Sequence, residues 1–215
     1  MSSTSNAAFP TLQDYLYVDL EVDQADQIYR IGLVCQDEEI DTKILTIAEE
    51  HLHRFYTPDV LICGHNFRRF DYPYFLRSFP EFNSGLVIDT LELSILSFPL
   101  LRSHRLDKIY KSSEYAINNP LEDALATKQL LGQIREELST KPLPLLRLYG
   151  YLLSCRQDPA SAAYSSWFST SIRVDLDTPP PIDSLPPKRS KGWIPLIWRS
   201  FSNKPGAKTL TKGSA

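Results

Sequence analysis

The order of strand-like and helical segments is what most constrains the fold of this 215-residue chain. Three short segments rich in β-branched and aromatic residues come first, at 15–20, 27–34 and 40–45, and short turns join them. They are expected to form an antiparallel meander. Two mainly apolar segments follow at 59–63 and 86–88, alternating with helical segments, as is typical of buried parallel strands. This order predicts an α/β fold with a mixed sheet flanked by helices.

Helix signals separate and follow these strands. Pro120 can occupy the first turn of a helix, acidic residues follow it, and apolar residues recur at helical spacing up to Leu138. The expected helices cover 47–55, 71–78, 90–97, 120–138 and 143–153. After Ser154 the periodic pattern fades.

Charge and composition divide the chain into parts. We expect a disordered lead at 1–12, a main domain at 13–140, a helical extension at 141–170 and a proline-rich basic tail at 171–215. From Ser184 to the end there are seven Lys or Arg residues and no acid. The preceding residues hold 16 basic and 26 acidic side chains, a net charge of −10. The pattern predicts an acidic folded part followed by a basic tail without regular structure.

The tail carries the sequence KRSKGWIPLIWRSF at 188–201. Basic residues with interleaved aromatic rings can bind single-stranded nucleic acid through phosphate pairing and base stacking. A partner-docking motif, a weak contact with a membrane surface and a disordered tail without a specific partner are the alternatives. The sequence leaves these interpretations open.

The cysteines and the N-terminus indicate a cytoplasmic protein. Cys35, Cys63 and Cys155 are widely spaced, and no CxxC or Cys/His spacing predicts zinc. Cys35 and Cys63 lie in apolar strand segments, where buried free thiols are expected. Residues 1–8 lack the basic and apolar regions of a signal peptide. No apolar run reaches the ~20 residues that span a bilayer.

Four acidic residues stand at the ends of the expected elements. Asp19 and Glu21 lie at the end of the first strand, and their i, i+2 spacing directs both carboxylates to one face. Asp71 and Asp123 lie at the starts of two helices. Acids beside a hydrophobic strand are costly unless a cation or partner compensates them. Oxygen ligands of this kind suit Mg²⁺ or Mn²⁺ rather than zinc.

Each of these motifs is weak when it is taken alone. A DxE pair is common, and an Asp at a helix start is often only an N-cap, which is the alternative for Asp71 and Asp123. The ordered set is more specific: DxE at a strand end, then GHNxxxFD, IDTLEL and LEDALAT. The glycine of GHNxxxFD permits a close backbone approach at a strand-to-helix turn.

The motifs YVDLEVD, GHNFRRFD, VIDTLEL and NPLEDALATKQLL resemble those of the DEDD exonuclease superfamily, over residues 15–138. That superfamily includes DNA-polymerase proofreading subunits, ribonuclease T and oligoribonuclease. LEVD, IDTLELSILSFP and HRLDKIYK are also similar to exonuclease domains fused to, or encoded beside, bacterial RecQ-type helicases. The resemblance implies a ribonuclease-H-like fold, with a three-strand antiparallel meander plus parallel strands. It also implies 3′→5′ exonuclease activity and a helicase partner.

The resemblance assigns the four acids to two Mg²⁺ or Mn²⁺ ions. Asp19 would bridge both ions, Glu21 and Asp123 would bind the first, and Asp71 would hold the second. Two such cations about 3.5–4 Å apart hold the attacking and leaving oxygens of a phosphoryl displacement. The expected substrates are DNA or RNA 3′ ends, single strands above all, and the products are nucleoside monophosphates.

Further roles follow from the same resemblance. His65 and Asn66 would be structural or would line the substrate pocket. Leu20, with Val22, would lie near the terminal nucleotide. Phe70 would belong to the core.

The general base of the family is missing from its usual positions. One branch has His five residues before the last Asp and the other has Tyr four residues before it; here these positions hold Asn118 and Asn119. Neither amide accepts a proton near pH 7, and general-base help is worth about 10²–10⁴-fold. Three outcomes stay open: a slow nuclease, a nuclease whose base comes from elsewhere, such as His104, or an inactive module. Such a module would bind a nucleic-acid end and recruit a helicase or another partner. The complete carboxylate set favours activity.

An acidic domain that acts on a polyanion is expected to have basic walls near its site. A solvated charged face is the alternative. The candidate residues flank Asp71 or precede Asp123: Arg68, Arg69, Arg77, Arg102, Arg105 and Lys108.

Overall fold

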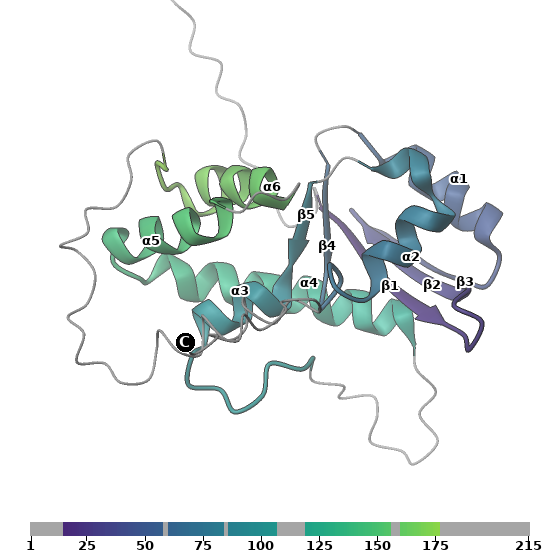
Figure 1. Ribbon diagram of the computed structural model, residues 1–215, viewed down its shortest axis with the longest axis horizontal. Coiled ribbons are helices and arrows are strands. Elements are labelled where there is room, and N and C mark those ends of the chain that lie inside the picture. The colour runs from purple at the N-terminus through teal and green to yellow at the C-terminus, as the bar shows by residue number, and fades with distance from the viewer. Residues whose placement is uncertain (1–14, 58–59, 84–85, 107–118, 156–159, 177–215) are drawn as a thin grey trace, which may run out of the picture. The chain divides into compact units, whose positions relative to one another are not determined.

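A mixed five-stranded sheet forms the centre of the protein (Figure 1). The computed structural model describes residues 15–57, 60–83, 86–106, 119–155 and 160–176. Their strands are β1 (Tyr15–Val22), β2 (Ile28–Cys35), β3 (Glu38–Thr42), β4 (Leu61–Gly64) and β5 (Val87–Asp89). The strand order is β3-β2-β1-β4-β5. β1, β2 and β3 pair antiparallel, whereas β4 pairs parallel with both β1 and β5. The predicted α/β class and its antiparallel meander with added parallel strands are confirmed.

Helices flank this sheet. The longer ones are α1 (Leu45–Phe55), α2 (Asp71–Ser78), α3 (Thr90–Ser97), α4 (Pro120–Ser139), α5 (Leu143–Ser154) and α6 (Ala160–Trp167). Two short turns of helix are η2 (Pro80–Phe82), which is 3₁₀, and η4 (Phe168–Ile172), which is π-type. α6 lies within the expected helical extension at 141–170, but its bounds and those of η4 were not predicted. The third strand lies at 38–42 rather than at 40–45, because α1 already begins at Leu45.

The alternation of side chains along β1 separates the two faces of the sheet. Leu16 and Val18 belong to one apolar cluster with residues of α1 and α2. Tyr17 points to the opposite face, where Nζ of Lys128 on α4 lies 6.0 Å from the centre of its ring. Figure 1 shows α4 crossing the sheet on the side away from α1 and α2. Because Asp19 is two residues after Tyr17, it shares the α4 face.

A glycine brings the start of α4 onto the sheet. Gly32 of β2 pairs with Asp19 of β1. A Cβ atom at Gly32 would lie 2.2 Å from the carbonyl carbon of Pro120, the first residue of α4. Only a residue without a side chain therefore permits this approach, and the approach carries Asp123 toward Asp19.

The helices after α4 also pack onto the sheet. Tyr164, Trp167 and Phe168 are fully buried. The hydroxyl groups of Tyr15 on β1 and Ser171 on η4 share a hydrogen bond of 2.6 Å. α5 and α6 lie side by side (Figure 1). The C-terminal helices therefore contribute core residues to the same compact unit as the sheet.

Other expectations concern the thiols, the membrane and the tail. Cys35 and Cys63 are buried free thiols, as predicted, and Cys155 is exposed. Within the described residues, none of the helices combines the length and apolarity that a bilayer crossing requires. The lead at 1–12, and the tail from 177 onward, lie outside the described residues.

Candidate functional site

The candidate site lies where the parallel strands β1, β4 and β5 reach their carboxyl ends. β1 ends with Asp19 and Glu21 close to its last residue, β4 ends at Gly64, and β5 ends at Asp89. Gly64 pairs with Asp89, so these two strand ends are level. Ligand sites of open α/β sheets are found at this edge.

Three of the four predicted acids converge there. Ligand oxygens of Asp19, Glu21 and Asp123 all lie within 4.8 Å of one another. Asp123 is 3 % exposed, and the other two are half-buried. Asp123 is not the N-cap of α4, because Asn119 has that role and accepts a 3.2 Å hydrogen bond from the backbone N–H of Leu121. The capping alternative is therefore wrong for Asp123.

The fourth acid, Asp71, is not one of this trio, but its carboxyl group interacts with the backbone N–H of Leu20, the residue between Asp19 and Glu21. Asp71 is the first residue of α2 and is 3 % exposed, while Phe70 is the N-cap without a side-chain capping bond. The capping alternative is wrong for Asp71 also. Burial raises its pKa to about 8, and the charges of Asp89 and Glu21 add to the rise. The backbone N–H groups of Asp71 and Leu20 oppose it.

The trio fits a hard cation. In an octahedral site with bonds of about 2.1 Å, ligand oxygens lie about 3–4.2 Å apart. Carboxylate oxygens within 4.8 Å of one another can reach that arrangement by small side-chain rotations. The donors are all oxygen atoms, which favours Mg²⁺ or Mn²⁺ over zinc. Asp19, Glu21 and Asp123 can therefore hold one divalent ion.

The GHNxxxFD motif builds the turn between β4 and α2. Phe67 is fully buried, and its Cβ lies 2.4 Å from where a Cβ on Gly64 would be, so the glycine allows the chain to fold back. Asn66 has a φ of 58°, a left-handed conformation that Asn adopts more readily than most residues. Nδ1 of His65 lies 3.0 Å from the hydroxyl oxygen of Thr90. His65 and Asn66 thus have structural contacts.

Two expectations concern apolar residues near the site, and of these only the one for Phe70 is tested by its burial. Phe70 is 52 % exposed, so its predicted place in the core is wrong. The reason is that Phe67 fills the core position below the turn, which leaves the ring of Phe70 beside Tyr74 on the surface, 6.0 Å away. Leu20 is 4 % exposed and packs in the apolar cluster on the α1 and α2 side.

Asp89 is a buried acid that lies outside the predicted set of site residues. Its carboxylate accepts hydrogen bonds from the backbone N–H groups of Asn66, Arg68 and Leu91, at 2.8, 3.1 and 2.9 Å. Burial raises its pKa to about 6, and the charge of Glu92 adds to the rise. The signal was present in VIDTLEL: an acid after a buried strand and before a helix is a typical N-cap.

Two basic side chains near the site, Arg30 and Arg68, form ion pairs within the fold. Arg30 pairs with Glu21 across the β1–β2 ladder, forms an ion pair with Asp41, and donates to the Asn119 side chain at 3.4 Å. Arg68 forms an ion pair with Glu92 at 2.9 Å. Four of the other predicted basic residues are exposed: Arg69, Arg77, Arg102 and Arg105. Lys108 lies outside the described residues.

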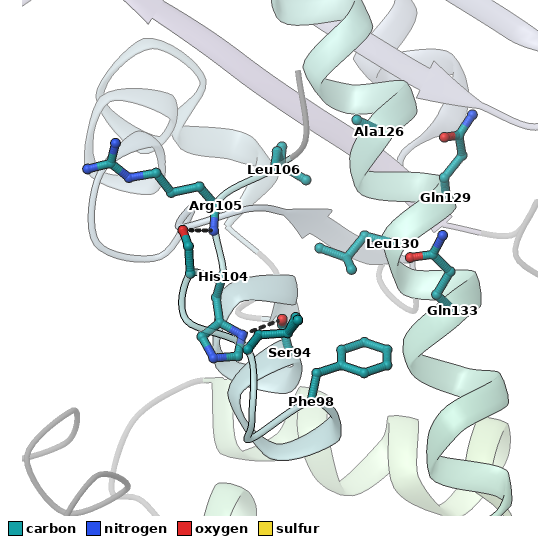
Figure 2. Close-up of a pocket in the computed structure, with 11 residues that line it drawn as sticks. Ser94, Phe98, His104, Arg105, Leu106, Ala126, Gln129, Leu130 and Gln133 are labelled. Carbon is teal, nitrogen blue, oxygen red and sulfur yellow. Dashed lines mark hydrogen bonds between the residues drawn. The ribbon is translucent and has the colours of Figure 1, made fainter. Parts of the chain in front are cut away.

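The residues considered as a general base have different surroundings. Asn118 lies outside the described residues, and Asn119 caps α4. Nδ1 of His104 lies 2.8 Å from the hydroxyl oxygen of Ser94, and burial lowers the pKa of the imidazole. His104 lines a pocket of about 420 Å³ between α3, the following loop and α4 (Figure 2). The structure does not bring it into the carboxylate trio.

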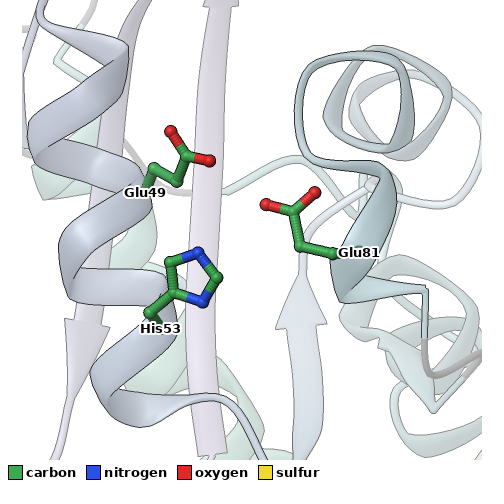
Figure 3. Close-up of side chains that lie close together, drawn as sticks. All are labelled: Glu49, His53 and Glu81. Carbon is green, nitrogen blue, oxygen red and sulfur yellow. The ribbon is translucent and has the colours of Figure 1, made fainter.

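A second group of ligand-type side chains lies on another part of the surface. Glu49 and His53 are one turn apart on α1, and Glu81 faces them from η2 (Figure 3). Their ligand atoms lie within 4.8 Å of one another. His53 and Glu81 are exposed, and the imidazole packs against Phe82 with ring centres 4.9 Å apart. Exposed acidic groups often cluster in this way without an ion.

Comparisons with known proteins found no matching family model, no significant match among curated proteins and none among solved structures. The functional interpretation therefore depends on the geometry of the chain itself. That geometry defines a carboxylate-lined edge of an α/β sheet.

Proposed function

We propose that this chain is a metal-dependent 3′→5′ exonuclease of the DEDD type, with a ribonuclease-H-like fold, acting on DNA or RNA 3′ ends. The observation that carries the proposal is the convergence of Asp123 with Asp19 and Glu21, which are far away along the chain, within 4.8 Å. Asp19 and Glu21 come from the predicted strand end, and Asp123 comes from the predicted helix start. Single strands are the preferred substrates in this proposal.

The four acids divide the binding of two divalent ions. Asp19, Glu21 and Asp123 would hold one Mg²⁺ or Mn²⁺, and Asp71 with Asp19 would hold the second. When bound, such ions activate water and stabilise the charge that develops on the leaving 3′ oxygen. The chain itself contributes the orientation of the carboxylates: β1 fixes Asp19 and Glu21, and the packing of α4 on Gly32 fixes Asp123.

One observation favours a second candidate function. Asn119 already caps α4 through its side-chain oxygen, and an amide cannot accept a proton near pH 7. The lack of a general base at this position fits a module with weak or no cleavage. Such a module would bind metal and a nucleic-acid end and would recruit a helicase. The complete set of four acids favours cleavage, because cleavage uses two ions, one to activate water and one to stabilise the leaving oxygen, whereas binding an end requires neither step.

Cleavage of a single strand labelled at its 5′ end distinguishes the two functions. With Mn²⁺, an exonuclease shortens the labelled strand stepwise from the 3′ end, and a strand labelled at its 3′ end releases a labelled mononucleotide. Asp19→Asn should abolish both results, because it removes the charge shared by the two ions. Asp37→Asn, which changes an exposed acid in the turn between β2 and β3, is the matched control and should cleave normally.

A strand that stays at full length with excess protein and Mn²⁺ contradicts the exonuclease proposal. If the same protein still retains labelled single strands on a filter, and Asp19→Asn weakens that retention, the end-binding function is supported instead.

A further inference from the structure

The helices that follow α4 reach the site through one hydroxyl group. Tyr164 on α6 is fully buried, and its hydroxyl donates a 2.7 Å hydrogen bond to Oε2 of Glu92 on α3. The same hydroxyl oxygen accepts a 3.2 Å hydrogen bond from the backbone N–H of Asp89. Burial raises the pKa of Tyr164 well above its usual value, so the hydroxyl keeps its proton. One side chain of α6 thus contacts both acids that begin α3.

These two acids hold the turn that leads to Asp71. The carboxylate of Asp89 accepts the backbone N–H groups of Asn66 and Arg68. Glu92 binds the guanidinium of Arg68 at 2.9 Å. The turn is therefore held by hydrogen bonds at Asn66 and at Arg68, and it leads directly into Asp71, the first residue of α2.

The contacts are sheltered from water, which strengthens their effect. The side chains of Arg68 and Glu92 are 16 % and 13 % exposed, and Asp89 is 2 % exposed. The guanidinium also lies 5.9 Å from the centre of the Tyr164 ring. A hydrogen bond in such surroundings is stronger than in water, and an unsatisfied group there is costly. Removing one hydroxyl would leave the backbone N–H of Asp89 without this acceptor.

We propose that Tyr164 is a positioning residue for the candidate metal site, so that the helices beyond α4 are part of the machinery that orients Asp71. The inference rests on the proposed function, because it takes Asp71 as a ligand of the second ion. Partners around metal ligands typically change metal affinity or activity 10–100-fold when they are replaced. A purely structural Tyr164 would instead affect only the stability of the fold.

Tyr164→Phe tests the proposal, because it keeps the ring and removes only the hydroxyl. Tyr149→Phe is the matched control: Tyr149 is buried on α5, and its hydroxyl has no hydrogen-bond partner among the described residues. Mn²⁺ binding is measured directly by electron paramagnetic resonance, and cleavage is measured across a Mn²⁺ titration. Tyr164→Phe should weaken Mn²⁺ binding about 10-fold or more and raise the half-saturating Mn²⁺ concentration equally. KM for the strand should change less than about twofold.

The outcomes are distinct for the inference and for the proposed function. Mn²⁺ binding by Tyr164→Phe equal to that of the unmodified protein overturns the inference, and so does an equal loss in Tyr149→Phe. If the unmodified protein binds Mn²⁺ but cleaves nothing, the exonuclease proposal fails while the binding data still test the inference. If Tyr164→Phe does not fold, Mn²⁺ binding is measured in the same way for Glu92→Gln. This variant removes the negative charge that accepts hydrogen bonds from both Arg68 and Tyr164. Unchanged Mn²⁺ binding in Glu92→Gln then overturns the inference.

Discussion

Replacing Gly32 with alanine should separate the carboxylates of the trio without changing any of them. The added Cβ would lie 2.2 Å from the carbonyl carbon of Pro120, whereas ordinary contacts begin at 3.4 Å. The start of α4 must therefore retreat by about 1.2 Å, the difference between these two distances. Because Asp123 lies in the first turn of α4, its carboxylate would move away from Asp19 by a similar amount.

A shift of this size is large for a magnesium-type site. Mg²⁺ requires near-ideal geometry with bonds of about 2.0–2.1 Å, and a misplacement of about 1 Å can reduce a rate about 10²-fold. We expect Gly32→Ala to lower kcat/KM about 10²-fold and to weaken Mn²⁺ binding. Overpacking should also destabilise the fold by about 1–3 kcal/mol. Cleavage assays, Mn²⁺ titration and thermal unfolding measure the three effects.

Gly150→Ala is the matched control. The Cβ that it adds on α5 would meet Cδ2 of Leu176, the end of a flexible side chain, at 2.6 Å and Cγ of Phe168 at 3.1 Å, and neither of these contacts is with backbone. Alanine is also the better helix former by about 1 kcal/mol. This variant should keep the activity and Mn²⁺ affinity of the unmodified protein. A folded Gly32→Ala protein with unchanged Mn²⁺ affinity and cleavage would refute the reasoning, since α4 would then not need its close approach.

Three further predictions concern charge and stability. Asp71→Asn should raise the melting temperature in EDTA at pH 7, because it removes an acid that must take up a proton in order to be buried. It should also reduce the rise in melting temperature that Mn²⁺ produces, and an unchanged melting temperature in EDTA contradicts this prediction. The folded pKa of Asp71, about 8, exceeds its usual value of 3.8, so the folded protein holds the extra proton between these values. The contribution of Asp71 to the free energy of unfolding in EDTA should therefore fall as pH rises from about 4 to about 8. Urea titrations at several pH values measure the slope of the free energy of unfolding against pH. Equal slopes for the unmodified protein and Asp71→Asn would argue against this prediction. Tyr15→Phe removes the hydrogen bond to Ser171 and should lower the free energy of unfolding by about 1 kcal/mol. Cleavage should stay unchanged, because Tyr15 begins β1 whereas Asp19 and Glu21 lie near its other end, and a large loss of cleavage would contradict this.

Elements with strong local signals could be predicted from the sequence. α2 and α3 begin and end at the predicted residues, since each has an acid near its start and apolar residues at helical spacing. The bounds of α6, within the expected helical extension at 141–170, could not be predicted, because its sequence ASAAYSSW is short and rich in small residues. Its burial depends on Tyr164 and Trp167 meeting the sheet, a contact between segments about 75 residues apart.

The candidate metal ligands could be predicted from the sequence, but the residues whose packing positions them could not. The i, i+2 spacing of Asp19 and Glu21 and the helix start before Asp123 predicted three acids that the structure brings together. Nothing local in the sequence indicates that Gly32 receives the start of α4, because Pro120 is far away along the chain. The prediction for Phe70 came from the resemblance of its motif, and it was wrong because Phe67, not Phe70, is the aromatic residue of this turn that points inward.

The two buried acids of the edge differ in how their charges are compensated. Asp89 accepts three backbone N–H groups, and its pKa of about 6 leaves it mostly ionised at pH 7. Asp71 is buried with weaker compensation, and with a pKa of about 8 it is mostly protonated at pH 7. Asp89 can therefore act as a permanent acceptor that holds the turn, whereas Asp71 has to lose a proton when it binds a cation. This division explains how the fold tolerates so many acids at one edge: the acid that holds the turn is ionised, and the neighbouring acid is neutral until a cation replaces its proton.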